Sequence, residues 1–147
     1  MDTFDLASAL RGAVSDLHKR LRKQAYSVMG DSIGCFSITE QTTLSYLYRE
    51  GSLYPSELAD INKIKKQSMS QVLNHLEEAK MIRRIASKED RRKISISLTV
   101  RGKKMVEQSR SERDEWLAGA IRKVLQEKEI RILEAAIPLL EKIVNVY

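Results

Sequence analysis

The sequence predicts a mainly α-helical protein with a small β-wing, whose elements follow the order ααααββαα and whose long terminal helices form a dimerisation domain. Three observations support this fold class. Apolar residues recur at three- and four-residue steps over most of the 147 residues, the period changes to two between residues 81 and 98, and the excess positive charge is confined to residues 63–104. With 42% hydrophobic residues at this length, we expect one folded domain over residues 1–147.

The first two helices are predicted from apolar periodicity and from the residues that interrupt it. A long amphipathic helix is expected from Asp5 to about Met29, and Gly30 begins the segment that ends it. Its apolar stripe contains Leu6, Leu10, Ala13, Val14, Leu17, Leu21, Ala25 and Val28. A second helix should begin after Thr39, a good N-cap residue, and end at Gly51.

Two shorter helices follow, joined by a turn at Lys63–Ile64. Pro55 fits the first turn of a helix that extends to about Asn62, although Tyr54 is a poor N-cap residue. The next helix is expected from Lys65 to about Ala79. Its predicted inner residues are Met69, Val72, Leu73 and Leu76, and its predicted outer residues are Lys66, Gln67, Ser68, Gln71 and His75. The outer face is therefore polar and basic.

The next segment has the alternating pattern of β-strands. Met81–Ile85 and Lys93–Leu98 are predicted as two strands, and the polar, basic residues 86–92 between them form a hairpin tip. Thr99 is placed to cap a long helix that extends towards Val124. A last helix is expected from about Glu127 to Val144, and Pro138 within it should remove one backbone hydrogen bond.

The charge distribution indicates a polyanionic partner. Residues 63–104 contain thirteen Lys/Arg against four Asp/Glu, a net charge of +9, whereas residues 1–62 carry −2 and residues 105–147 carry −1. A basic segment can also be an ordinary solvated surface, but this one coincides with the polar helix and the hairpin.

The residue content argues against enzymes, metal proteins and membrane proteins. One cysteine and two histidines supply neither a disulfide nor the ligands of a structural metal, and there is no Gly-rich phosphate loop. We therefore expect no catalytic activity and no cofactor. No run approaches 18 apolar residues, and the first fifteen residues lack the signal-peptide pattern, so we expect a cytoplasmic protein without a membrane partner.

Two short helices followed by a basic two-stranded hairpin make a winged helix-turn-helix. A helix fits the major groove of double-stranded DNA, where polar side chains can bind base edges and lysines can neutralise phosphates. A hairpin tip with arginines can reach the minor groove. The candidate DNA-binding residues are Lys65, Lys66, Gln67, Ser68, Ser70, Gln71, Asn74, Arg91, Arg92 and Lys93.

Several motifs carry a resemblance to a known family. They are Thr39–Gln41, Ser56–Ala59, Asn74–Glu77 and above all the segment Asp90–Gly102. In these segments the chain resembles the MarR family of bacterial transcriptional regulators, whose wing has an Asp-Arg-Arg tip and a Leu-Thr-x-x-Gly junction. The sequence departs from the usual family pattern at Ser87–Lys88 in the wing and at Gln71 in the fourth helix.

The resemblance implies roles for particular residues and a mode of assembly. Asp90 would orient the wing through a charge-assisted bond, and Arg92, with Arg91, would enter the minor groove. The family implies a homodimer formed by residues 1–30 and 100–147, with residues 38–99 as the DNA-binding region. The apolar residues of the last two helices give an independent reason to expect a partner helix. Such a dimer would bind a palindromic operator.

The family also implies a repressor that is released by a small aromatic ligand or by cysteine oxidation. His18 is the candidate for a contact with the ligand, although a solvated histidine is the alternative. Cys35 is the candidate for oxidation, although a buried inert cysteine is the alternative. A non-specific architectural DNA-binding protein and a winged helix that binds proteins remain rival functions. The polar surface of the fourth helix favours sequence-specific binding to double-stranded DNA over both.

Overall fold

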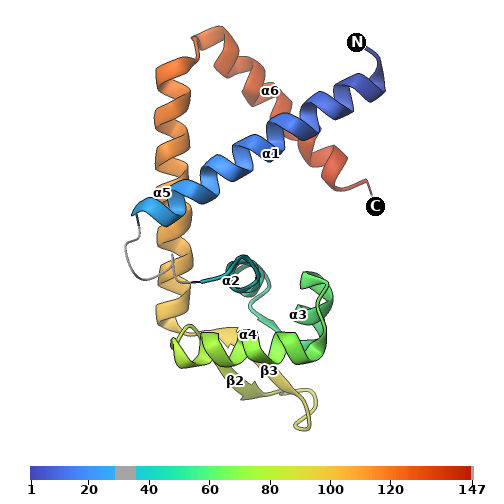
Figure 1. The fold of residues 1–147 in the computed structure, drawn as a ribbon, viewed down its shortest axis with the longest axis vertical. Helices are drawn as coiled ribbons and strands as arrows, with labels where there is room; N and C mark the ends of the chain where they lie inside the picture. Colours follow the sequence, from blue (N-terminus) through green and yellow to red (C-terminus); the bar gives the residue numbers. More distant parts are fainter. Residues whose placement is uncertain (29–35, 147) are drawn as a thin grey trace. The chain divides into compact units, whose positions relative to one another are not determined.

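The computed structural model describes residues 1–28 and 36–146, and it confirms the predicted mainly helical fold with a small β-wing (Figure 1). The helices are α1 (Thr3–Val28), α2 (Ile38–Glu50), α3 (Pro55–Asn62), α4 (Lys66–Glu78), α5 (Val100–Val124) and α6 (Glu127–Val144). The strands are β1 (Ser52–Leu53), β2 (Ile82–Ala86) and β3 (Ile94–Leu98). The bounds of α3 and α6 agree with the sequence prediction.

Strand β1 was not predicted from the sequence, where its residues formed a connection. The three strands form an antiparallel sheet in the order β1-β3-β2. Ser52 pairs with Ser97 and Leu53 with Ile96. Two residues are too few to show an alternating pattern, so this strand depends on its partner and not on its own sequence.

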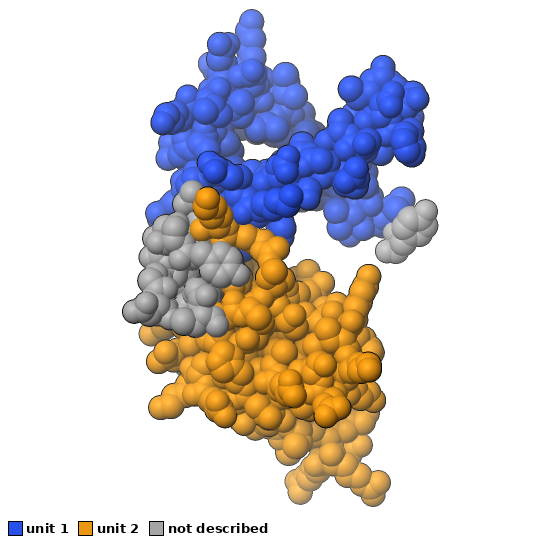
Figure 2. Space-filling view, viewed as in Figure 1, with its two compact units in different colours: residues 1–21, 113–147 blue, residues 22–112 orange. Residues whose placement is uncertain are grey.

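The described residues form two compact units, residues 22–112 and residues 1–21 with 113–147 (Figure 2). The core of the first unit combines side chains from α2, α3, α4, the sheet and the beginning of α5. Its buried residues are Phe36, Leu44, Leu47, Leu58, Ala59, Met69, Leu73, Leu76, Met81, Ile82, Ile96 and Val106. Burial of these apolar side chains holds the three short helices against the sheet.

The second unit leaves many apolar side chains exposed. In the described chain, α6 contains no buried residue, and Pro138 lies within it. The exposed apolar residues of this unit include Phe4, Leu6, Val14, Leu17, Val124, Ile132, Leu133, Ile137, Leu139, Ile143 and Val144. The guanidinium of Arg20 lies over the ring of Trp116, 5.9 Å from its centre. Across the described residues, no helix is both long and apolar enough to span a membrane.

The N-cap of α2 is Ser37, so the prediction of Thr39 was wrong by half a turn. Ser37 Oγ accepts a hydrogen bond from the Glu40 N–H at 3.2 Å, and the Glu40 carboxylate accepts one from the Ser37 N–H at 3.4 Å. This reciprocal capping box satisfies two backbone donors, whereas Thr39 is already within the first turn. At the other end, Gly51 closes the helix with φ of 86°, as predicted.

The junction between β3 and α5 explains the Leu-Thr-x-x-Gly motif. Thr99 Oγ1 accepts a hydrogen bond from the Gly102 N–H at 3.0 Å and donates one to the Lys80 carbonyl at 2.6 Å. The Thr99 N–H donates to the Met81 carbonyl at 3.0 Å. A Cβ atom at position 102 would lie only 2.1 Å from that same carbonyl oxygen. The motif therefore brings α5 against the chain that enters the wing.

Candidate nucleic-acid interface

The turn between α3 and α4 has the left-handed residue that a helix-turn-helix requires. Lys63 has φ of 53° and ψ of 44°, and its N–H donates to the Asp60 carbonyl at 3.1 Å. The Ile64 N–H donates to the Ala59 carbonyl at 3.1 Å. These bonds close α3, and Lys65 then begins α4 from an extended conformation.

Helix α4 separates its inner and outer faces as the periodicity predicts. Met69, Leu73 and Leu76 are buried, and Val72 is half-buried. All of the candidate DNA-binding residues on or next to this helix are exposed, namely Lys65, Lys66, Gln67, Ser68, Ser70, Gln71 and Asn74. The helix contains no acidic residue before Glu77. Its outer face is therefore suited to contact a polyanion.

His75 is exposed on the outer side of α4, as predicted, but it also makes a contact that the sequence prediction missed. Its side chain is half exposed, but Nδ1 lies 2.5 Å from Glu40 Oε2 of α2. The ring of Phe36 contacts the imidazole edge to face, with 5.7 Å between ring centres. His75 therefore links α4 to the capped beginning of α2. No local pattern indicates this contact, because the two partners are 35 residues apart.

Arg84 of β2 provides a second link to α4 that the sequence prediction missed. Its Nη2 donates a hydrogen bond to Asn74 Oδ1 at 2.7 Å, and its Nε lies 3.4 Å from Glu77 Oε2. Residues 83 and 84 alternate between the two faces of the sheet, and Arg84 pairs with the buried Ile96. This alternation is the signal that could have placed Arg84 on the side of α4.

The wing tip is a closed turn in which Asp90 has a defined partner. Asp90 Oδ1 accepts a hydrogen bond from the Arg92 N–H at 3.0 Å, and the Asp90 carbonyl accepts one from the Lys93 N–H at 2.9 Å. A carboxylate that accepts a backbone N–H makes a charge-assisted bond of the kind expected for this residue. The side chains of Arg91, Arg92 and Lys93 are exposed.

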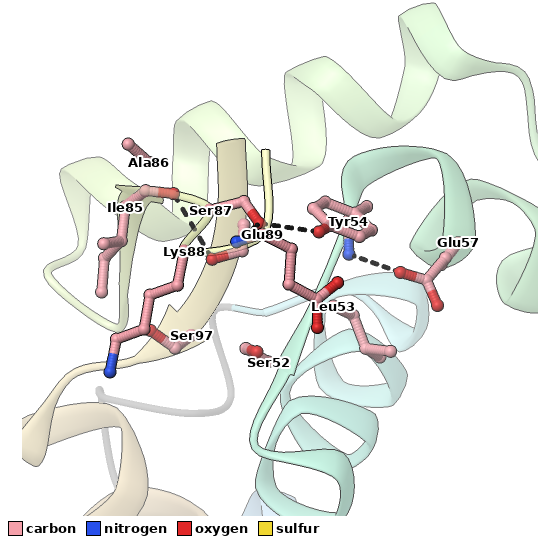
Figure 3. Close-up of a pocket in the computed structure, with 11 residues that line it drawn as sticks. Ser52, Leu53, Tyr54, Glu57, Ile85, Ala86, Ser87, Lys88, Glu89 and Ser97 are labelled. Atoms are coloured by element: carbon pink, nitrogen blue, oxygen red, sulfur yellow. Dashed lines mark hydrogen bonds between the residues drawn. The ribbon is translucent and has the colours of Figure 1, made fainter. Parts of the chain in front are cut away.

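Ser87, a departure from the family pattern, organises the base of the tip. Its hydroxyl is buried and lies 2.8 Å from the Tyr54 hydroxyl (Figure 3). It accepts hydrogen bonds from the N–H groups of Glu89 and Asp90 at 3.3 and 3.4 Å. The ammonium of Lys93 lies over the Tyr54 ring, 5.3 Å from its centre. The tip is therefore anchored to the beginning of α3. The sequence prediction missed this anchor too.

A hollow of about 490 Å³ lies beside this anchor (Figure 3). Its walls come from β1, the beginning of α3, the end of β2, the wing tip and β3. The lining residues are Ser52, Leu53, Tyr54, Glu57, Ile85, Ala86, Ser87, Lys88, Glu89, Ser95 and Ser97. The Tyr54 N–H donates to the Glu57 carboxylate at 3.0 Å, which caps α3 in place of a Tyr54 side-chain bond.

The structure gives no contact between His18 and this region. Cys35 lies outside the described residues, and His18 is exposed on the part of α1 that belongs to the other unit. In the part of the chain that the structure describes, no cluster of three His, Cys, Asp or Glu residues could hold a metal ion.

Comparisons with known proteins place this geometry in a family. A model of the MarR family matches residues 37–93, from the N-cap of α2 to the end of the wing tip. A helix-turn-helix transcriptional regulator of Mycobacterium tuberculosis is 29% identical over 140 residues, which cover 95% of this chain and 93% of the relative.

Two solved structures extend the comparison to the fold. A Pseudomonas aeruginosa protein assigned as a transcriptional regulator is 30% identical with a TM-score of 0.80, over 96% of this chain and 95% of that chain. A mutant of Staphylococcus aureus MepR bound to an oligodeoxyribonucleotide is 22% identical with a TM-score of 0.66, over 99% and 100% of the two chains.

The relatives confirm the prediction of a transcriptional regulator and not an enzyme. The chain has the helix-turn-helix, the wing and the Leu-Thr-x-x-Gly junction that the family resemblance required. It therefore belongs to the MarR family of winged helix-turn-helix, DNA-binding transcriptional regulators.

Proposed function

We propose that the protein is a homodimeric repressor that binds a palindromic operator on double-stranded DNA and is released by a small aromatic ligand or by oxidation. In this proposal residues 1–147 form one MarR-like domain, with DNA binding by residues 38–99 and dimerisation by residues 1–30 and 100–147. The observation that carries it is the exposed polar face of α4, which has no acidic residue before Glu77, next to a wing tip that exposes two arginines.

Helix α4 would lie in the major groove. Gln67, Gln71 and Asn74 follow one another at steps of four and three residues, so they share one face of the helix. Amide side chains both donate and accept hydrogen bonds, which suits them to base edges. Lys65 and Lys66 would bind phosphates, with Ser68 and Ser70 as further polar contacts. This chemistry favours a sequence-specific regulator over an architectural DNA-binding protein or a protein-binding module.

The wing tip would enter the adjacent minor groove. Arg91, Arg92 and Lys93 are exposed at the tip, and the narrow minor groove has a negative potential that attracts guanidinium groups. Asp90 would orient the tip, since its carboxylate accepts a hydrogen bond from the Arg92 N–H. This bond fixes the backbone of the turn, and the Arg92 side chain projects from it.

Dimerisation is supported by the apolar surface of the second unit. Ile132, Leu133, Ile137 and Leu139 of α6 are 45–67% exposed, and Phe4 of α1 is 82% exposed. A stable protein rarely leaves so many large apolar side chains in water, so a second copy of the chain would cover them. Two-fold symmetry would place two α4 helices on half-sites about one turn of DNA apart.

Effector release rests on family resemblance. His18 is the candidate for a ligand contact and Cys35 the candidate for oxidation, and each needs a direct test. A regulator that acts on the chromosome of a bacterium would function in the cytoplasm.

A salt titration of DNA binding tests the proposal. The DNA that flanks the protein's own gene is compared with a scrambled duplex of equal length, using the wild type, Arg92→Ala and the control Arg49→Ala. Arg49 is an exposed arginine of α2, so its loss changes the charge equally without touching the wing. We expect the wild type to prefer the native duplex at about 150 mM salt with two chains per site.

Arg92→Ala should weaken operator binding by about 1 to 3 kcal/mol, whereas Arg49→Ala should change it by less than about 0.5 kcal/mol. Unchanged affinity in Arg92→Ala would remove the wing from the mechanism. Equal wild-type affinity for both duplexes, collapsing as salt rises, would favour the architectural alternative, and selection from random duplexes would then decide between that function and a wrong choice of operator.

A further inference from the structure

Arg84 of strand β2 fixes the orientation of the Asn74 side chain, which lies on the face of α4 proposed to contact base edges. A guanidinium group has only donors, so the atom of the Asn74 carboxamide that faces Arg84 at 2.7 Å must be the oxygen. The amide nitrogen then occupies the other branch of the carboxamide. Asn74 is exposed, and it shares its helix face with Gln67 and Gln71.

The surroundings of Arg84 hold it in this contact. Glu77, one turn after Asn74, lies 3.4 Å from Arg84 Nε and supplies a second anchor with opposite charge. The Arg84 side chain is 30% exposed, because it lies on the sheet face that carries the buried Ile82 and Ile96. A guanidinium that is anchored at two points and partly covered is better suited to position a neighbour than to bind a phosphate itself.

We propose that Arg84 is a positioning residue that presents the Asn74 amide to DNA as a hydrogen-bond donor, and so couples the wing strand to sequence reading by α4. This inference rests on the proposed function, in which α4 lies in the major groove. An asparagine normally reads adenine with both atoms of its amide, accepting from N6 and donating to N7. With one lone pair of its oxygen engaged by Arg84 and its orientation fixed, Asn74 presents its amide N–H groups to DNA.

The consequence is a base preference that differs from the usual one for asparagine. A donating amide favours guanine, which presents the two acceptors N7 and O6, over adenine, which presents the acceptor N7 beside its own N6 donor. Loss of Arg84 would free the carboxamide to rotate and to read adenine with both atoms. The wing strand would thus change specificity at a base pair that it does not touch.

Arg83 provides a matched control on the same strand. It pairs with Ser97, whereas Arg84 pairs with Ile96, so the two arginines lie on opposite faces of the sheet. Both are exchanged for glutamine, which removes the same charge from neighbouring positions. Any effect that reflects only the positive charge of the wing should be similar in the two variants.

The experiment selects binding sites from random duplexes for the wild type, Arg84→Gln, Arg83→Gln, Asn74→Ala and the double variant Asn74→Ala with Arg84→Gln. Affinities for the wild-type consensus are measured in parallel, and thermal unfolding checks that each variant folds. Arg84→Lys is included because it keeps the charge and a donor, so it should retain the wild-type base preference.

We expect Arg84→Gln and Asn74→Ala each to weaken binding about three- to tenfold and to alter preference at the same base pair. Arg83→Gln should weaken binding less than about twofold and keep the preference. The double variant should resemble Asn74→Ala alone, because Arg84 acts through Asn74.

Three results would overturn the inference. Equal weakening by Arg84→Gln and Arg83→Gln with unchanged preference would make Arg84 a simple charge. Additive effects in the double variant would mean that Arg84 acts independently of Asn74. A wild type that selects adenine at the Asn74 position as strongly as Arg84→Gln does would contradict the restraint of the Asn74 amide by Arg84. By contrast, a wild type that selects no consensus at all would refute the proposed function itself.

Discussion

Replacing Gly102 by alanine tests whether the junction between the wing and α5 depends on close contact of the backbones. The added Cβ would lie 2.1 Å from the Met81 carbonyl oxygen and 3.0 Å from its carbonyl carbon. Real Cβ atoms essentially never approach another heavy atom below 3.0 Å, so α5 and the chain before β2 must separate by almost 1 Å. The obstacle is backbone, which cannot rotate out of the way as a flexible side chain can.

The cost follows from the bonds at this point. The Met81 carbonyl also accepts the Thr99 N–H at 3.0 Å, and Thr99 caps α5 through the Gly102 N–H at 3.0 Å. Overpacking at a tight contact costs about 1 to 3 kcal/mol, and each weakened hydrogen bond about 1 kcal/mol. Alanine recovers up to about 1 kcal/mol of helix propensity. We therefore expect a net loss of about 2 to 4 kcal/mol in the free energy of unfolding.

Thermal and urea unfolding at one fixed protein concentration measure this loss. The fixed concentration matters because assembly of two chains would contribute to apparent stability. For a chain of this size, the expected loss lowers the melting temperature by about 6 to 12 °C. Gly119→Ala in the same helix is the matched control, since a Cβ there meets no atom within 4 Å, and it should be neutral or stabilising by up to about 1 kcal/mol. If the Gly102 variant were as stable as the wild type, the close contact would not be a determinant of the fold.

Two further predictions concern the wing anchor and Tyr48. Ser87→Ala removes the hydroxyl that contacts Tyr54 and accepts from two tip N–H groups. Operator affinity should therefore fall about three- to tenfold and the melting temperature by about 3 to 6 °C, and an unaltered affinity would show that the tip needs no anchor. The hydrogen bond that Tyr48 donates to Glu107 at 3.2 Å raises the pKa of its phenol above the usual 10.0, with desolvation and the Glu107 charge acting in the same direction and Arg110 opposing them. Because the folded pKa is the higher one, the stability from this bond is present below pH 10 and is lost as the pH rises through the raised pKa. An absorbance titration, with Tyr48→Phe to identify the signal, should show the phenol titrating at lower pH in Glu107→Gln, and an identical titration would exclude Glu107 as the cause.

Local patterns in the sequence predicted the helices and the wing with good accuracy. The start of α3 at Pro55 and the exposed face of α4 depend on one residue's geometry and on helical periodicity, both of which act within a few positions. The N-cap of α2 shows the limit of such reasoning. Ser37 and Thr39 are both suitable residues, and the reciprocal bonds with Glu40 decide for Ser37.

The candidate DNA-binding residues could be named from the sequence because each is a polar residue on an amphipathic pattern or a basic residue at a hairpin tip. Their supports could not be named in this way. Tyr54 and Ser87 are 33 residues apart, and His75 and Glu40 are 35 residues apart. Such pairs leave no local signal, since a hydroxyl or carboxylate has many possible partners until the chain is folded.

By itself, the sequence determined the order of the elements, the amphipathic faces, the basic segment and the family resemblance, because these depend on the spacing of residue types along the chain. The tertiary structure alone decided the pairing of β1, the close contact at Gly102 and the orientation of Asn74 by Arg84. Each of these brings together segments that are separate in sequence. Their geometry depends on how the core of residues 22–112 packs, and packing is a property of the folded chain as a whole.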